Sequence, residues 1–69
     1  MPITVAIIGL GIMGRRMLEH MSWHDAFAPV ALWDPDPDAC QAAQQLCPQA
    51  VIASNADAAI DAAALIYLA

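Results

Sequence analysis

Three glycines near the N-terminus have the spacing of a phosphate-binding loop. Gly9, Gly11 and Gly14 occupy the glycine positions of a G-x-G-x-x-G pattern that directly follows the apolar run Ile3–Ile8. In such a turn the first glycine allows a sharp exit from a strand, the second leaves room for a pyrophosphate against the main chain, and the third lets a helix pack closely on the strand. The free amides at the start of that helix bind the phosphates. The pattern therefore predicts a dinucleotide-binding turn.

An acidic residue follows this loop at the distance that dinucleotide-binding folds use. Asp34 lies about 20 residues after Gly14, at the end of a second apolar run. A carboxylate at this place accepts hydrogen bonds from the hydroxyls of the adenosine ribose and repels a 2′-phosphate, so we expect the cofactor to be NAD rather than NADP. Arg15 and Arg16 follow the loop directly; an arginine that reached a 2′-phosphate would oppose this preference.

Charge and composition exclude several classes of partner. Seven acidic and two basic residues give a net charge of −5 at pH 7, which disfavours nucleic acid and anionic membranes as partners. The apolar runs are far shorter than a membrane span, and no export signal is present. We therefore expect a cytoplasmic protein in which Cys40 and Cys47 remain reduced thiols. His20 and His24 are four residues apart but have no third ligand of suitable spacing, so we expect no metal site.

Strands and helices are predicted to alternate along the chain. Unbroken apolar runs predict the strands, whereas amphipathic spacing and capping residues predict the helices. Asp36 and Pro37 have the types typical of a helix start, and residues 54–57 resemble a capping box. We expect strands at residues 3–8, 30–34, 51–53 and 65–68, and helices at residues 13–22 and 37–47 and, opened by the capping box, at residues 54–62.

This alternation predicts an α/β fold of the Rossmann type. Right-handed crossovers give a parallel sheet in the order 3-2-1-4 with flanking helices, and its switch point brings Gly11 and Ala69 to one crevice. A dinucleotide fold normally continues beyond a fourth strand. We therefore expect residues 1–69 to be the N-terminal part of a dinucleotide-binding domain, truncated after the fourth strand and lacking a substrate domain. The unpaired fourth strand leads us to expect a homo-oligomer.

Three segments resemble the opening of the glucose-fructose oxidoreductase, inositol dehydrogenase and MocA family: residues 5–14, 31–37 and 65–69. The resemblance spans nearly the whole chain. It implies an NAD(P)-dependent oxidoreductase that transfers hydride between a nicotinamide cofactor and a sugar-like or cyclitol-like alcohol or carbonyl. It also implies a set of cofactor-binding residues, comprising the phosphate loop, two helix amides, a ribose ligand and the start of the nicotinamide side: Gly9, Gly11, Gly14, Ile12, Met13, Asp34 and Ala69.

The catalytic residues of that family have no counterpart in this chain. The family places its lysine in a Glu-Lys-Pro motif after the next strand, and an aspartate and a histidine that assist proton transfer come later still. The resemblance therefore implies that this fragment alone is inactive and that the missing domain holds the small-molecule substrate.

Two other interpretations remain open. Residues 8–14 also resemble the start of the 3-hydroxyisobutyrate dehydrogenases, which share the loop and the fold and carry their lysine in a long all-helical second domain. That family usually has a shorter connector with a glycine before its second strand, whereas residues 24–29 are longer and contain none, so we favour the sugar-oxidoreductase interpretation. The third interpretation is a non-catalytic module that senses dinucleotides. A catalytic lysine further along the parent gene would distinguish enzyme from sensor.

Overall fold

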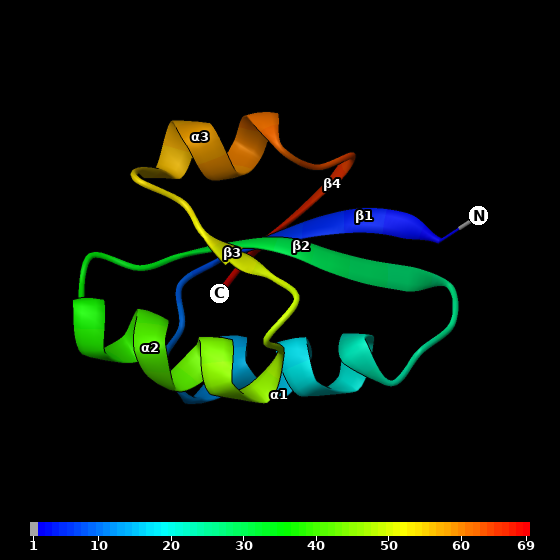
Figure 1. Ribbon diagram of the computed structural model, residues 1–69, viewed down its shortest axis with the longest axis horizontal. Helices are drawn as coiled ribbons and strands as arrows, with labels where there is room; N and C mark the ends of the chain where they lie inside the picture. The colour runs from blue at the N-terminus through cyan, green and yellow to red at the C-terminus, as the bar shows by residue number, and fades with distance from the viewer. Residues whose placement is uncertain (1) are drawn as a thin grey trace.

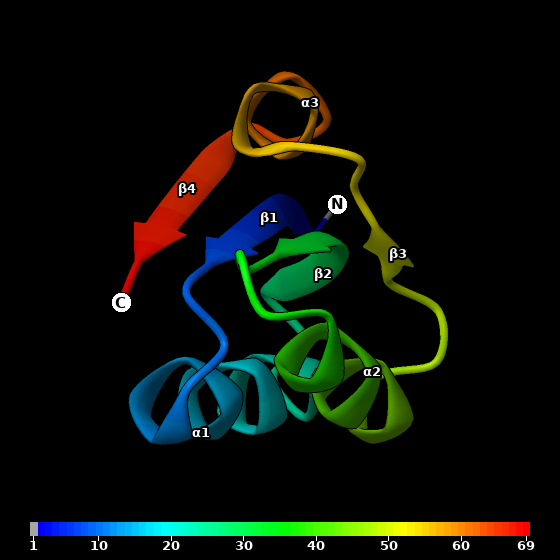
Figure 2. The same cartoon turned by 90° about the vertical axis from the view of Figure 1, so that its left-hand side faces the viewer.

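The computed structural model describes residues 2–69 and confirms the predicted fold class. Within these residues four strands form one all-parallel sheet in the order β3-β2-β1-β4. Helices α1 and α2 cover one face of the sheet and α3 covers the other (Figures 1 and 2). The elements are β1 (Ile3–Ile8), α1 (Ile12–Ser22), β2 (Phe27–Trp33), α2 (Pro37–Leu46), β3 (Val51–Ile52), α3 (Ala56–Asp61) and β4 (Leu65–Leu68).

Strand β1 lies at the centre of the core because both of its faces are covered. Val5, Ala6 and Ile7 are fully buried. The side under α1 and α2 is packed by large apolar residues such as Ile7 and Leu18, whereas the side under α3 is packed mainly by alanines, including Ala6 and Ala59. The apolar run that predicted the strand thus also supplies both layers of the core.

Strand β2 begins three residues earlier than predicted, at Phe27 instead of residue 30. Pro29 was expected to lie at the end of the connector, and proline cannot donate to a sheet ladder. The structure accommodates it at an irregularity of the register, where Val5 is opposite Pro29 but Ala6 is opposite Ala31. Val30 is therefore the extra residue of a bulge, and a bulge is one of the places where a strand tolerates proline.

Two helix starts depend on side-chain caps. Asp36 caps α2 as predicted: its carboxylate accepts a hydrogen bond from the amide of Asp38, at 3.0 Å. The cap of α3 is Asn55, whose amide oxygen accepts from the amide of Ala58 at 2.8 Å. The capping box suggested for residues 54–57 is therefore replaced by an asparagine cap one residue into that segment.

The two cysteines are buried free thiols, as predicted. Burial raises the pKa of the Cys47 thiol, so this group stays neutral and acts as a small apolar core residue. None of the helices in residues 2–69 is long and apolar enough to cross a membrane.

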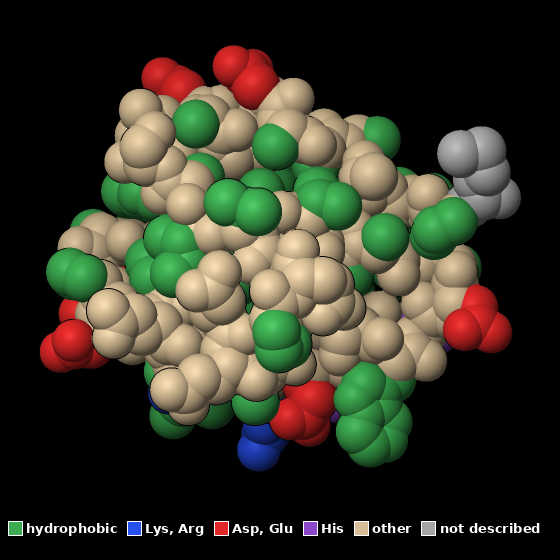
Figure 3. Space-filling view, in the orientation of Figure 1, with side chains coloured by type: hydrophobic (Ala, Val, Ile, Leu, Met, Phe, Trp, Pro, Cys, Tyr) green, Lys and Arg blue, Asp and Glu red, His purple; other side chains and the backbone are tan. Residues whose placement is uncertain are grey.

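The two edges of the sheet are strands β3 and β4. Strand β4 pairs only with β1, and its side chains are half-buried or exposed. Acidic side chains lie around the rim of the face seen in Figure 3, and apolar side chains lie across its middle. The edge that β4 exposes contains no charged residue to hinder pairing with another strand.

Candidate functional site

The glycine turn lies where the carboxyl ends of three strands meet. Gly9 has a φ of +97°, a conformation that side chains other than glycine rarely adopt. Its amide donates to the carbonyl oxygen of Trp33 on β2 at 2.9 Å, and the amide of Ala69 donates to the carbonyl oxygen of Ile8 at 2.9 Å. A Cβ atom on Gly9 would lie 2.9 Å from the carbonyl oxygen of Ala69. The turn is thus fixed by both neighbouring strands.

The other two glycines of the pattern have opposite surroundings. A Cβ atom on Gly14 would overlap the carbonyl oxygen of Gly9, so the fold itself requires glycine there. A Cβ atom on Gly11 would have no protein atom within 4 Å. Packing within this chain therefore gives no reason for glycine at position 11, whereas a ligand lying against the main chain does.

The N-terminus of α1 lies beside the open space at Gly11. No acidic side chain in its first turn neutralises the positive end of the helix dipole. Gly11 is the residue that caps the helix, and it has no side chain to accept from the first amides. The first turn contains no acidic residue, and the side chains of Ile12 and Met13 are 69% and 63% exposed. The amides of this turn are suited to bind an anion that lies beside Gly11.

Asp34 is bonded directly to the glycine turn. One carboxylate oxygen accepts from the amide of Leu10 at 2.7 Å, and the other accepts from the amide of Asp36 at 2.8 Å. Each carboxylate oxygen has two lone pairs, so both retain capacity for a ligand hydroxyl. Asp34 therefore joins the end of β2 to the loop after β1, in addition to any contact with a ribose.

Leu10 is the residue of this site that the sequence interpretation missed. Its side chain is fully buried, and its backbone amide is the partner of the Asp34 carboxylate. The only signal in the sequence is its position between the first two glycines, since a backbone donor leaves no trace in the residue type. The loop is consequently anchored by an apolar side chain on one side and by a carboxylate on the other.

A cavity of about 270 Å³ lies beside Asp34, among the ends of β2 and β3 and the start of α2. Its lining includes Trp33, Asp34, Cys40 and Ala53, and the Cys40 thiol donates to the Asp34 carbonyl oxygen at 3.4 Å. Neither arginine contributes to this lining. Arg15 and Arg16 line a separate hollow on the flank of α1. Asp34 and the two arginines thus line different hollows.

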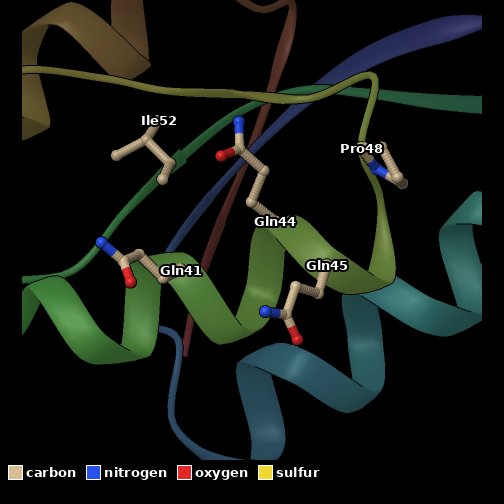
Figure 4. A pocket seen from close by; sticks show the side chains of 5 residues that line it. All are labelled: Gln41, Gln44, Gln45, Pro48 and Ile52. Atoms are coloured by element: carbon tan, nitrogen blue, oxygen red, sulfur yellow. The ribbon is translucent and has the colours of Figure 1, made fainter.

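A larger hollow, of about 850 Å³, lies between α2 and the edge strand β3. Its lining is shown in Figure 4 and consists of Gln41, Gln44, Gln45, Pro48 and Ile52. These residues include no titratable group, and the Gln44 side chain already donates to the carbonyl oxygen of Ala50 at 3.0 Å. The chemistry expected of this chain therefore belongs to the glycine turn and not to the larger hollow.

Groups that could act on a substrate are sparse. Within the described part of the chain no three histidine, cysteine, aspartate or glutamate side chains come together as a metal site would require. The two basic residues of the whole chain are both arginines, so it contains no lysine. The site is thus equipped to bind a dinucleotide but has no evident acid and base pair for proton transfer.

Comparison with protein families gives a match over almost the whole chain. Residues 4–69 match the family described as the NAD binding domain of 6-phosphogluconate dehydrogenase. A comparison with curated proteins finds no match.

This match corrects the resemblance to the glucose-fructose oxidoreductase, inositol dehydrogenase and MocA family, which is wrong. The preference for that family over the 3-hydroxyisobutyrate dehydrogenases depended on the length of the connector before β2. In the structure residues 27–29 of that segment already belong to β2, and the short connection from α1 lies at the amino edge of the sheet, whereas the glycine turn lies at the carboxyl edge. Because surface connections tolerate insertions, the connector length carries no information about the cofactor site.

Proposed function

We propose that this chain, which belongs to the family of the NAD binding domain of 6-phosphogluconate dehydrogenase, holds NAD for a dehydrogenase of the 3-hydroxyisobutyrate type. Membership of this family places the chain among the NAD(P)-binding domains of oxidoreductases. The finer assignment is supported by the segment of residues 8–14, which resembles the start of the 3-hydroxyisobutyrate dehydrogenases. The parent enzyme would transfer hydride between a hydroxyl-bearing substrate and the nicotinamide.

The observation that carries this proposal is the free space beside Gly11. A pyrophosphate lying there would meet the amides of Ile12 and Met13 and the positive end of α1. Asp34 would accept hydrogen bonds from the adenosine ribose while keeping its bond to the Leu10 amide. NAD would supply the hydride acceptor, and the residues of this chain would hold it at the carboxyl edge of the sheet.

The nicotinamide half would lie toward β4. Ala69 follows β4 and is bonded to the end of β1, so it is placed to border that half of the cofactor. Because this chain contains no lysine, we propose that the catalytic groups and the substrate site belong to a further domain of the parent protein, and that the isolated chain binds NAD without turnover. We expect a helical domain with a lysine in the parent gene, and the gene sequence checks this; a parent without such a lysine would favour the sensor.

Replacing Asp34 by asparagine tests the cofactor preference. The single amide oxygen can accept from the Leu10 amide but no longer also from the Asp36 amide, and the charge that repels a 2′-phosphate is lost. We expect the wild-type chain to bind NAD more tightly than NADP, and we expect the variant to reduce this ratio by about tenfold, or ~1.4 kcal/mol. Calorimetric titration with both cofactors measures the ratio.

The matched control is Asp61→Asn, which makes the same charge change at the far end of α3. This variant should leave the ratio of the two affinities unchanged. Tighter binding of NADP than of NAD by the wild-type chain would contradict the preference, and equal shifts in both variants would show that net charge alone is responsible.

We also propose that this chain, tested as the 69-residue protein, associates with itself through β4. The strand has one unpaired edge, and Leu65 and Leu68 are both exposed. Leu65→Lys should shift sedimentation velocity profiles toward the monomer, because a lysine on an edge strand opposes pairing. Val51→Lys, on the opposite edge of the sheet, is the control and should associate like the wild type. A wild-type chain that remains monomeric at high concentration would contradict the proposal.

A further inference from the structure

Helices α1 and α2 cover the same face of the sheet, but the charges at their N-termini differ (Figure 2). Helix α1 follows β1 and begins after Gly11, with no capping side chain and no acidic residue in its first turn. Helix α2 follows β2 and begins after Asp36, whose carboxylate caps it, and Asp38 adds a second acid in the first turn. The N-terminus of α1 is therefore open to an anion, whereas that of α2 already carries two carboxylates.

Hydrogen bonds hold the start of α2 next to Asp34. The Asp34 carboxylate accepts from the amide of Asp36 at 2.8 Å, and the Asp36 carboxylate accepts from the amide of Asp38 at 3.0 Å. Two residues of extended chain span at most about 7 Å, so the backbone of Asp36 stays within that distance of Asp34. The acids at the start of α2 are thus fixed close to the proposed ribose site.

Several backbone amides that a phosphate could use at the start of α2 are missing or already bonded. Pro37 is the first residue of the helix and has no amide hydrogen. The amide of Asp38 donates to the Asp36 carboxylate, and the amide of Cys40 donates to the carbonyl oxygen of Asp36 at 3.2 Å. A phosphate at this place would therefore meet two carboxylates and gain few hydrogen bonds.

The 2′-phosphate of NADP would have to lie beside this helix start. In the proposed site Asp34 accepts from the hydroxyls of the adenosine ribose, and NADP carries its extra phosphate on the 2′-oxygen of that ribose. A phosphate monoester has a charge of about −1.5 to −2 at pH 7. Arg15 and Arg16 line a hollow to which none of the three acids contributes. The charged residues that the phosphate would meet at the start of α2 are Asp36 and Asp38.

We propose that Asp36 and Asp38 disfavour NADP independently of Asp34, by adding two negative charges beside the place of the 2′-phosphate. This inference rests on the proposed cofactor function and gives the site a second determinant of selectivity. Asp34 both binds the ribose and repels the phosphate, whereas Asp36 and Asp38 only repel the phosphate. Removing charge at the start of α2 should therefore strengthen NADP binding and leave NAD binding nearly unchanged.

The double variant Asp36→Asn/Asp38→Asn of the 69-residue chain tests this inference. Asparagine caps a helix as well as aspartate does, so α2 should keep its start and the Asp36 amide should keep its bond to Asp34. Calorimetric titration at low salt should show NADP bound about tenfold more tightly than by the wild type, and NAD changed by less than about twofold. The single variant Asp38→Asn, which leaves the cap untouched, should show about a threefold gain for NADP.

Salt distinguishes charge repulsion from a change of structure. Both acids are exposed, so their effect on a phosphate is screened by ions. In 1 M salt, where the Debye length is about 3 Å, the gain of the double variant for NADP should largely disappear. A gain that is the same at low and high salt would overturn the inference, because it would come from a rearranged loop.

The matched control is the double variant Asp25→Asn/Asp61→Asn. Both double variants remove two negative charges, so the net charge of −5 becomes −3 in each. Asp25 precedes β2 and Asp61 precedes β4, so the control changes lie toward the amino edge of the sheet. Equal gains in the two double variants would overturn the inference, since net charge alone would explain them. An unchanged NADP affinity in the Asp36/Asp38 variant would overturn it while leaving the NAD site in place, whereas a wild-type chain that binds neither cofactor would overturn both.

Discussion

Replacing Gly11 by valine is expected to abolish NAD binding while the chain remains folded. The new side chain meets no protein atom at Cβ, and the extended conformation at this residue, with φ −70° and ψ −163°, is open to any side chain. The same side chain fills the space in which the pyrophosphate would contact the main chain. We expect the affinity for NAD to fall by about 100-fold or more, or ~2.7 kcal/mol.

Calorimetry and thermal unfolding together distinguish this effect from a loss of fold. The unfolding free energy of Gly11→Val should change by about 1 kcal/mol or less, the difference expected between glycine and an apolar residue at a helix cap. NAD should raise the melting temperature of the wild-type chain and not that of the variant. Gly11→Ala, with a smaller side chain, should give an intermediate affinity. Wild-type affinity in the valine variant would remove the central support for the cofactor site.

Most of the fold follows from local features of the sequence. The run Ile3–Ile8 is apolar without interruption because its strand is covered on both faces, and Pro37 after Asp36 marks a helix start by its chemistry alone. The sheet order then follows from the handedness of crossovers between parallel strands. The start of β2 was missed because a bulge depends on the register with β1, which is a property of two segments together.

The residues of the cofactor site could be predicted from the sequence, but the hydrogen bonds and packing contacts between them could not. The spacing of the glycines and the position of Asp34 placed the turn and the acid at the same edge of the sheet, and in the structure they are directly bonded. The partner of the acid is a backbone amide, which every residue except proline possesses, so no residue type could identify Leu10. The opposite surroundings of Gly11 and Gly14 likewise emerge only in three dimensions.

The family assignment failed for a different reason. Residues 24–29 were compared as a connector, but residues 27–29 belong to β2, and the loop before them lies at the edge of the sheet remote from the glycine turn. The segments that reach the carboxyl edge, residues 5–14, 31–37 and 65–69, predicted the dinucleotide site that the family match supports, but they did not distinguish one dehydrogenase family from another. Where ligands bind at the carboxyl ends of parallel strands, segments at that edge are the ones that report function.

Gly14→Ala is expected to destabilise the fold, whereas substitutions at Gly11 are expected to leave it stable. Glycine to alanine inside a helix normally stabilises a protein by about 1 kcal/mol. Here the added Cβ atom would overlap the carbonyl oxygen of Gly9. That carbonyl cannot easily move, since Gly9 has a φ of +97° and its amide is bonded to Trp33. We therefore expect α1 to be displaced from the sheet, with a loss of about 3 kcal/mol or more of unfolding free energy.

Gly11→Ala is the matched control for this effect, because it makes the same substitution three residues earlier at the cap of the same helix. Chemical denaturation should show nearly wild-type stability for Gly11→Ala and a large loss for Gly14→Ala. A domain of this size has only about 5 kcal/mol of stability, so the second variant should be largely unfolded under mild denaturant. If the two variants are equally stable, close packing of α1 on the glycine turn is not what fixes the position of the helix amides.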